Sequence, residues 1–257
     1  MIGGNSARKI FCAIDTDVLD TAVTLARALG GHVGGIKLGL EFFTAFGPQG
    51  VAALGKAVSG KAVSGEAASG EVPPLFLDLK YHDIPNTVAG AVSAAVALKP
   101  AFLTLHTTGG AAMLRAAAVA AADAAREAKI DRPLLLGVTE LTSLDADDLD
   151  DVGLRGPVGE RALRLAELAA EAGLDGVVAS AREVRAIRER LGPDFKLVVP
   201  GIRPAFANGA ADQKRTATPA EALAAGADFL VIGRPIAKAP DPLAALRRIV
   251  EEIDGKS

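Results

Sequence analysis

One short run of sequence, Leu75–Lys80 (LFLDLK), combines the pattern of a buried strand with two opposite charges. Because side chains alternate between the two faces of a strand, the three leucines form one apolar row, and Phe76, Asp78 and Lys80 point to the other side. Two opposite charges in a protein interior are costly unless they serve each other or a ligand. Asp78 and Lys80 therefore form either a structural ion pair or part of a reaction site.

Two further apolar runs also end in a charge, Asp15 in one and Lys37 in the other. Either residue alone could be a solvated charge at a strand end. Together with Asp78 and Lys80, they predict a cluster of alternating charges at one end of a sheet. Asp83 follows Lys80 by three positions and precedes Pro85 (in YHDIPNT), so it either joins this cluster or caps the helix that Pro85 begins.

The last part of the chain has features of a phosphate site. One run ends in VVPGIRP and is followed by a long connection that contains DQKR, while the next run ends in Gly233-Arg234. Glycine lets backbone N–H groups approach phosphate oxygens, and a guanidinium can pair with two of them. The alternative for Arg234 is a surface salt bridge. The connection from Gly201 to about Pro219 is longer than usual, which suggests a lid.

These residues require elements that bring them to one place. Short runs rich in Val, Ile, Leu and Phe alternate with Ala- and Leu-rich stretches at helical spacing, as in buried parallel strands joined by helices. Eight such units in one chain predict a single-domain (β/α)8 TIM barrel of the α/β class, with its reaction site at the C-terminal ends of the strands. The expected strands are Ile10–Asp15, Gly34–Leu38, Leu75–Lys80, Phe102–His106, Leu134–Thr139, Gly176–Ala179, Leu197–Pro200 and Phe229–Gly233.

One segment breaks the alternation of strands and helices. Residues 56–71 read KAVSGKAVSGEAASGE, a five-residue repeat rich in small residues. We expect a flexible surface insertion in the single domain 1–257, because lengthening a surface loop adds little closure entropy.

Composition narrows the function classes. The net charge of −3 gives no reason to expect a nucleic acid or an anionic membrane as partner. The single cysteine, Cys12, allows no intramolecular disulfide and no multi-cysteine metal site, and we interpret it as a packing residue. No apolar stretch approaches the ~20 residues of a spanning helix. We therefore expect a soluble, cytoplasmic protein, and we expect no cofactor, since no dinucleotide fingerprint or metal-ligand spacing is seen.

The motifs FCAID, GIKLG, LFLDLKYHDIPNT, LTLHTTGG, VTELTS, VVPGIRP with DQKR, and VIGRPI follow one another along nearly the whole chain. In this order and spacing the chain resembles the orotidine 5′-phosphate decarboxylases, especially the bacterial kind. The most specific element is D-x-K-x-x-D-I-P-x-T, which places Asp78, Lys80, Asp83, Ile84 and Thr87 in the family pattern.

The resemblance implies decarboxylation of orotidine 5′-monophosphate to uridine 5′-monophosphate (UMP) by a homodimer with shared active sites. Lys80 would protonate C6 of the pyrimidine beside Asp78 and Lys37, and Asp83 would come from the partner subunit. The substrate-binding positions that it implies are Asp15, Ile84, Thr87, Thr142, Pro200, Gln213, Gly233 and Arg234. Ser143 is an alternative to Thr142, Arg203 receives no role, and His106 is expected to be structural or interfacial.

Two other functions fit the same fold. A sugar-phosphate decarboxylase or synthase would need a divalent metal to stabilise an enediolate, and a non-catalytic barrel could bind a phosphorylated ligand. The D-I-P-x-T segment argues against the first, because these related enzymes lack it. The charge density predicted around Asp78 and Lys80 argues against the second.

Overall fold

The computed structural model describes residues 5–59, 72–207 and 215–255. Eight parallel strands form a closed barrel in chain order, each paired with its sequence neighbours and β8 with β1. The predicted single-domain barrel is confirmed, and every predicted strand is present with bounds that differ by at most two residues. The strands are β1 (Ile10–Ala13), β2 (Gly35–Leu38), β3 (Leu75–Tyr81), β4 (Phe102–His106), β5 (Leu134–Val138), β6 (Gly176–Val178), β7 (Lys196–Val199) and β8 (Phe229–Ile232).

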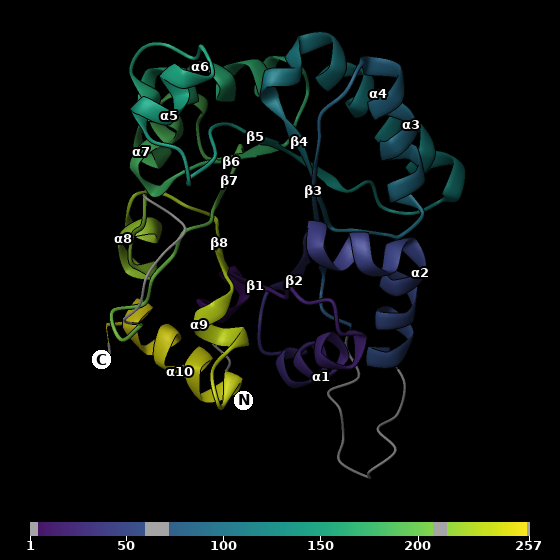
Figure 1. Ribbon diagram of the computed structural model, residues 1–257, viewed down its shortest axis with the longest axis vertical. Helices are drawn as coiled ribbons and strands as arrows, with labels where there is room; N and C mark the ends of the chain where they lie inside the picture. Colours follow the sequence, from purple (N-terminus) through teal and green to yellow (C-terminus); the bar gives the residue numbers. More distant parts are fainter. Residues whose placement is uncertain (1–4, 60–71, 208–214, 256–257) are drawn as a thin grey trace.

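Helices surround the strands, as Figure 1 shows in a view along the barrel. They are α1 (Leu19–Leu29), α2 (Leu40–Ser59), α3 (Pro85–Val96), α4 (Gly110–Ala128), α5 (Ala146–Asp151), α6 (Val158–Glu171), α7 (Ala181–Leu191), α8 (Pro219–Ala224), α9 (Arg234–Ala237) and α10 (Pro242–Ile253), with short 3-10 turns η1 (Ala7–Lys9) and η2 (Thr107–Gly109). Within the described ranges, no helix is both long and apolar enough to cross a membrane.

Local sequence explains where several helices begin. The hydroxyl of Thr218 accepts a hydrogen bond from the N–H of Glu221, and the Glu221 side chain returns one to Thr218, so that a capping box starts α8. Ser180 caps α7, and Asp241 caps α10.

The first four residues of the predicted insertion, 56–59, belong to α2, so the irregular part cannot start at Lys56. The rest of the repeat, 60–71, lies outside the described residues.

The core has two layers. Inside the barrel, four phenylalanine rings from β1, β3, β4 and β8 contact one another below the mouth, with centroids 4.9 Å apart for Phe11 and Phe102. Outside it, the other face of each strand packs against the helices. Leu77 and Leu79 are buried in this outer layer, and Phe76 in the inner one, as alternation along the strand predicts.

Candidate active site

A cavity of about 640 Å³ opens at the C-terminal ends of the strands. Its floor is the inner core layer, through Phe76, Val138, Val178 and Val231. The residues from the sequence prediction that line it are Asp15, Lys37, Asp78, Lys80, Thr142, Pro200, Gly233 and Arg234. Parallel strands end together at this mouth, so the fold brings residues from six of the eight βα units to one space.

Four of these side chains form a row of alternating charge. Nζ of Lys37 lies 3.2 Å from a carboxylate oxygen of Asp15 and 3.5 Å from one of Asp78. Nζ of Lys80 lies 2.8 Å from the same oxygen of Asp78. The Lys37 and Asp78 side chains are only 11% and 12% exposed, so these charges interact with little screening by water. The predicted cluster of Asp15, Lys37, Asp78 and Lys80 is therefore present.

Asp78 is held in its ionised form. Burial favours the neutral carboxyl group, but the nearby charges of Lys37 and Lys80 oppose this effect. Hydrogen bonds from Lys80 and from Thr104 on β4 also favour the ionised carboxylate. Together these contacts keep the pKa of Asp78 below its ordinary value, so that a negative charge stands between two ammonium groups at neutral pH.

Lys80 has an unusual backbone. Its φ is 50°, in the left-handed region that non-glycine residues seldom occupy, and its backbone N–H donates to Oγ1 of Thr104 at 2.9 Å. Residues held in this region are often part of functional sites. Lys80 adopts this conformation at the penultimate position of β3, just before the connection to α3.

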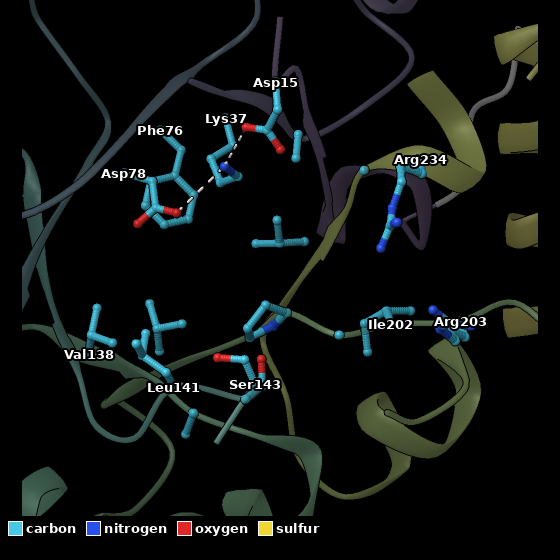
Figure 2. Close-up of a pocket in the computed structure, with 18 of the residues that line it drawn as sticks. Asp15, Lys37, Phe76, Asp78, Val138, Leu141, Ser143, Ile202, Arg203 and Arg234 are labelled. Atoms are coloured by element: carbon cyan, nitrogen blue, oxygen red, sulfur yellow. Dashed lines mark hydrogen bonds and ion pairs between the residues drawn. The ribbon is translucent and has the colours of Figure 1, made fainter. Parts of the chain in front are cut away.

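The opposite wall comes from loops. Figure 2 shows the carboxylate of Asp78 and the side chain of Lys37 on one side, Arg234 and Arg203 on the other, and Ser143 on the loop after β5. Arg234 is the first residue of α9 and is exposed at the mouth. Thr142 and Ser143 both line the cavity, so the alternative between these two hydroxyl residues stays open.

Three predicted site residues do not reach this cavity from their own chain. Asp83, Ile84 and Thr87 are exposed on the β3–α3 connection and the first turn of α3. The helix-capping alternative for Asp83 is wrong: Ile84 occupies the N-cap position, and a carboxylate oxygen of Asp83 accepts a hydrogen bond from the N–H of Ile84, outside the helix, at 2.6 Å. Gln213 lies outside the described residues.

The histidines stay apart from the cavity lining. His106, at the end of β4, faces His82 with ring centroids 5.5 Å apart. Burial, followed by the charges of His82 and Lys80, lowers the pKa of His106, so its ring is neutral at pH 7. His32 is half-buried before β2, and His82 is exposed on the connection after β3. In the described ranges, no three His, Cys, Asp or Glu side chains gather as metal ligands.

Sequence reasoning missed the residues that hold the site together. Thr104 is fully buried and donates to Oδ1 of Asp78 at 2.9 Å. Glu140 lines the cavity while its carboxylate pairs with Arg161 at 2.5 Å. Arg215 pairs with Glu183 and donates to the carbonyl oxygen of Leu141, another lining residue, at 3.1 Å. All three stand inside motifs of the family resemblance (LTLHTTGG, VTELTS and DQKR), but none has a spacing that marks its role.

Comparison with known proteins agrees with this geometry. Residues 8–249 match the model of the "Orotidine 5′-phosphate decarboxylase / HUMPS family". The chain is 52% identical to the orotidine 5′-phosphate decarboxylase of Rhodospirillum rubrum, over 96% of this chain and 94% of that protein. It is 48% identical to the one from Moorella thermoacetica, over 99% and 95%.

A solved structure of orotidine 5′-phosphate decarboxylase from Lactobacillus acidophilus superposes with a TM-score of 0.78 at 36% identity, covering 96% of this chain and 99% of that one. The family match spans all eight strands and the whole described lining of the cavity. The chain therefore belongs to the orotidine 5′-phosphate decarboxylase / HUMPS family.

Proposed function

We propose that this protein removes the carboxylate of orotidine 5′-monophosphate to give UMP, a step of pyrimidine biosynthesis. The observation that carries the proposal is the alternating row of Asp15, Lys37, Asp78 and Lys80 at the mouth of the barrel. Family membership supports it, because the relatives at about half identity are named for this activity.

The row of charges suits the chemistry. Loss of CO2 breaks the bond between C6 and its carboxylate, and the electron pair stays on C6 in the plane of the ring, where the π system gives little relief. A fixed ammonium group beside C6 stabilises that charge as it develops. Lys80 then gives its proton to C6, which forms the new C–H bond, and the neutral amine regains a proton from water. Lys37 keeps the charges alternating around Asp78.

The rest of the cavity would bind the remainder of the nucleotide. Asp15 and Lys37 would contact the ribose hydroxyls, and Thr142 and Pro200 would contact the pyrimidine. Gly233 and Arg234 would hold the phosphate with Gln213. Binding energy from these remote groups can hold the substrate carboxylate near Asp78 despite their repulsion. We infer that the reaction needs no cofactor and takes place in the cytoplasm.

A direct assay tests the activity. Orotidine 5′-monophosphate added to purified protein should lose its orotate absorbance as UMP forms, and dialysis against EDTA should leave the rate unchanged. A rate abolished by EDTA and restored by Mg²⁺ would support the metal-dependent sugar-phosphate chemistry instead. Binding of the nucleotide without turnover would leave a non-catalytic phosphate-binding barrel.

We further propose a homodimer whose active sites are shared. Asp83, Ile84 and Thr87 form an exposed group at the rim of the barrel, next to Lys80 in sequence, and Ile84 is 66% exposed. A large apolar side chain at this exposure gains from burial against another protein surface. In such a dimer Asp83 would complete the partner's row of charges.

Subunit mixing tests the shared site. Lys80→Ala and Asp83→Ala should each abolish most activity, whereas a hybrid dimer has one site with both lesions and one intact site. Random mixing makes about half of the dimers hybrid, so about a quarter of the wild-type activity should return. Co-expression with two different affinity tags isolates the hybrid. Purified hybrids that stay inactive would show that Asp83 acts within its own chain.

A further inference from the structure

The pairing of β3 with β4 is irregular at the site. Phe76 and Leu77 pair with Phe102 and Leu103, but the next pair is Tyr81 with Leu105. Residues 78–80 of β3 therefore lie opposite a single residue of β4, Thr104. Extra residues on one strand break the backbone ladder and redirect side chains, and bulges of this kind occur next to active sites.

The side chain of Thr104 occupies this break. Its Oγ1 accepts a hydrogen bond from the backbone N–H of Lys80 at 2.9 Å and donates one to Oδ1 of Asp78 at 2.9 Å. A hydroxyl group has one hydrogen to give, and a carboxylate can only accept, so the direction of both bonds is fixed. The backbone N–H of Lys80, in the stretch where the register shifts, thereby has a hydrogen-bond acceptor.

Each oxygen of the Asp78 carboxylate now has its own partners. Oδ1 accepts from Thr104, while Oδ2 faces Nζ of Lys80 at 2.8 Å and Nζ of Lys37 at 3.5 Å. The lysine contacts alone would let the carboxylate turn about its last side-chain torsion, whose energy profile is broad. The bond from Thr104 removes that freedom. It also joins the carboxylate to the backbone that carries Lys80.

Thr104 is completely buried and is not among the residues that line the cavity. A substrate therefore meets Asp78 and Lys80 but not the threonine. We propose that Thr104 is a positioning residue, whose hydroxyl sets the Asp78 carboxylate and the strained backbone of Lys80 in the geometry that proton transfer to C6 requires. This inference rests on the decarboxylase function proposed above.

The isosteric change Thr104→Val tests it, because it removes the hydroxyl group and keeps the shape of the side chain. We expect kcat to fall about 10- to 100-fold, the range for losing one hydrogen bond to a charged group. The inhibition constant of UMP should stay within about twofold, because the binding contacts remain. Thr104→Ser, which keeps the hydroxyl, should recover most of the rate.

Thr107→Val is the matched control. Thr107 is also fully buried, and its hydroxyl donates to the carbonyl oxygen of Val138 at 2.7 Å. Thr104→Val loses two buried hydrogen bonds and Thr107→Val loses one, so both should lower the melting temperature, but only Thr104→Val should lower kcat. Equal kcat losses in the two valine variants, or no rescue by serine, would overturn the positioning role.

An NMR titration, which requires no catalytic turnover, tests the role of Thr104 separately from the proposed function. The ¹³C resonance of the Asp78 carboxyl group reports its titration, and losing a bond to the ionised form should raise its midpoint in Thr104→Val but not in Thr107→Val. Lys37, Lys80 and Asp15 face the same carboxylate row and are unchanged in both. A wild-type protein that does not decarboxylate the substrate would sink the proposed function, whereas an unshifted midpoint would overturn the role of Thr104.

Discussion

The two sides of the cavity are built in different ways. On the side of β1, β2 and β3, the charged groups lie on or next to strands, and Lys37 and Asp78 are nearly enclosed. On the other side, Thr142 and Pro200 belong to loops, and Arg234 is exposed at the start of a four-residue helix. Groups on strands have little freedom, which suits a reaction that depends on fixed charges. Loops suit the binding of remote parts of a substrate.

The loop side depends on contacts from outside the cavity. Arg215 ties the loop after β5 to α7 through the Leu141 carbonyl oxygen and Glu183. The guanidinium carbon of Arg248 on α10 lies 3.9 Å from the ring centroid of Phe206, in the connection after β7. On the strand side, the supporting contacts lie within the row itself and, through Thr104, on the adjacent strand β4.

The largest effect should come from the strand side. Lys80→Ala removes the ammonium group that we propose to act in the transition state, so kcat should fall by at least about 1000-fold. The inhibition constant of UMP should change far less, because the lysine is needed mainly for the reaction. Lys99→Ala is the control: Lys99 shares the positive φ, at 53°, but lies outside the cavity lining and should leave kcat unchanged. Equal losses in rate and in UMP binding would remove the distinction between the two sides.

The next effect should appear on the loop side as a change in binding. Arg234→Ala should raise KM for the nucleotide about 10- to 100-fold, the range for losing a charge-assisted contact to phosphate. The slow reaction of the phosphate-free nucleoside should hardly change. Arg247→Ala, on the outer surface of α10, is the control with the same loss of charge. An equal loss on both substrates would contradict the phosphate role.

A moderate effect should follow when the loop after β5 is released. Arg215→Lys keeps a charge for Glu183 but loses the planar fork that reaches the Leu141 carbonyl oxygen. Inhibition by UMP should weaken about 10-fold, while inhibition by ribose 5-phosphate, which lacks the base, stays unchanged.

The control for Arg215 is Arg188→Lys. Arg188 also joins a carboxylate, Asp228, and a backbone carbonyl, Gly226, but it does so near the start of β8, at the far end of the barrel. This variant should affect the melting temperature and neither inhibition constant. Weaker binding of ribose 5-phosphate to Arg215→Lys would mean that the loop does not select for the base.

The smallest effect should come from α10. Arg248→Ala with Glu252→Gln loosens the connection after β7, because Arg248 stacks on Phe206 and Glu252 accepts from the N–H of Ala205 at 3.0 Å. KM for the nucleotide should rise only about two- to fivefold, in line with exposed contacts of this kind. The neighbouring exposed pair, Arg247→Ala with Glu251→Gln, makes the same charge changes and should leave KM as it is.

The sequence alone determined the barrel and the strand side of the cavity. Buried parallel strands read as short apolar runs, and a charge at the end of such a run, as in Lys37 or Asp78, has to lie at the mouth where the strands end together. The apolar runs and the charges at their ends are both local features, so they can be recognised in the sequence without knowledge of the fold.

Only the tertiary structure decided how those charges are held. Thr104 and Asp78 are 26 positions apart in the sequence and meet because β3 and β4 pair with an irregular register. Arg215 and Leu141 are 74 positions apart and meet because the connection after β7 contacts the loop after β5. A threonine is common in strands and an arginine is common in loops, so neither residue type indicates its partner. Both contacts arise from the way separate βα units pack together, which no local pattern encodes.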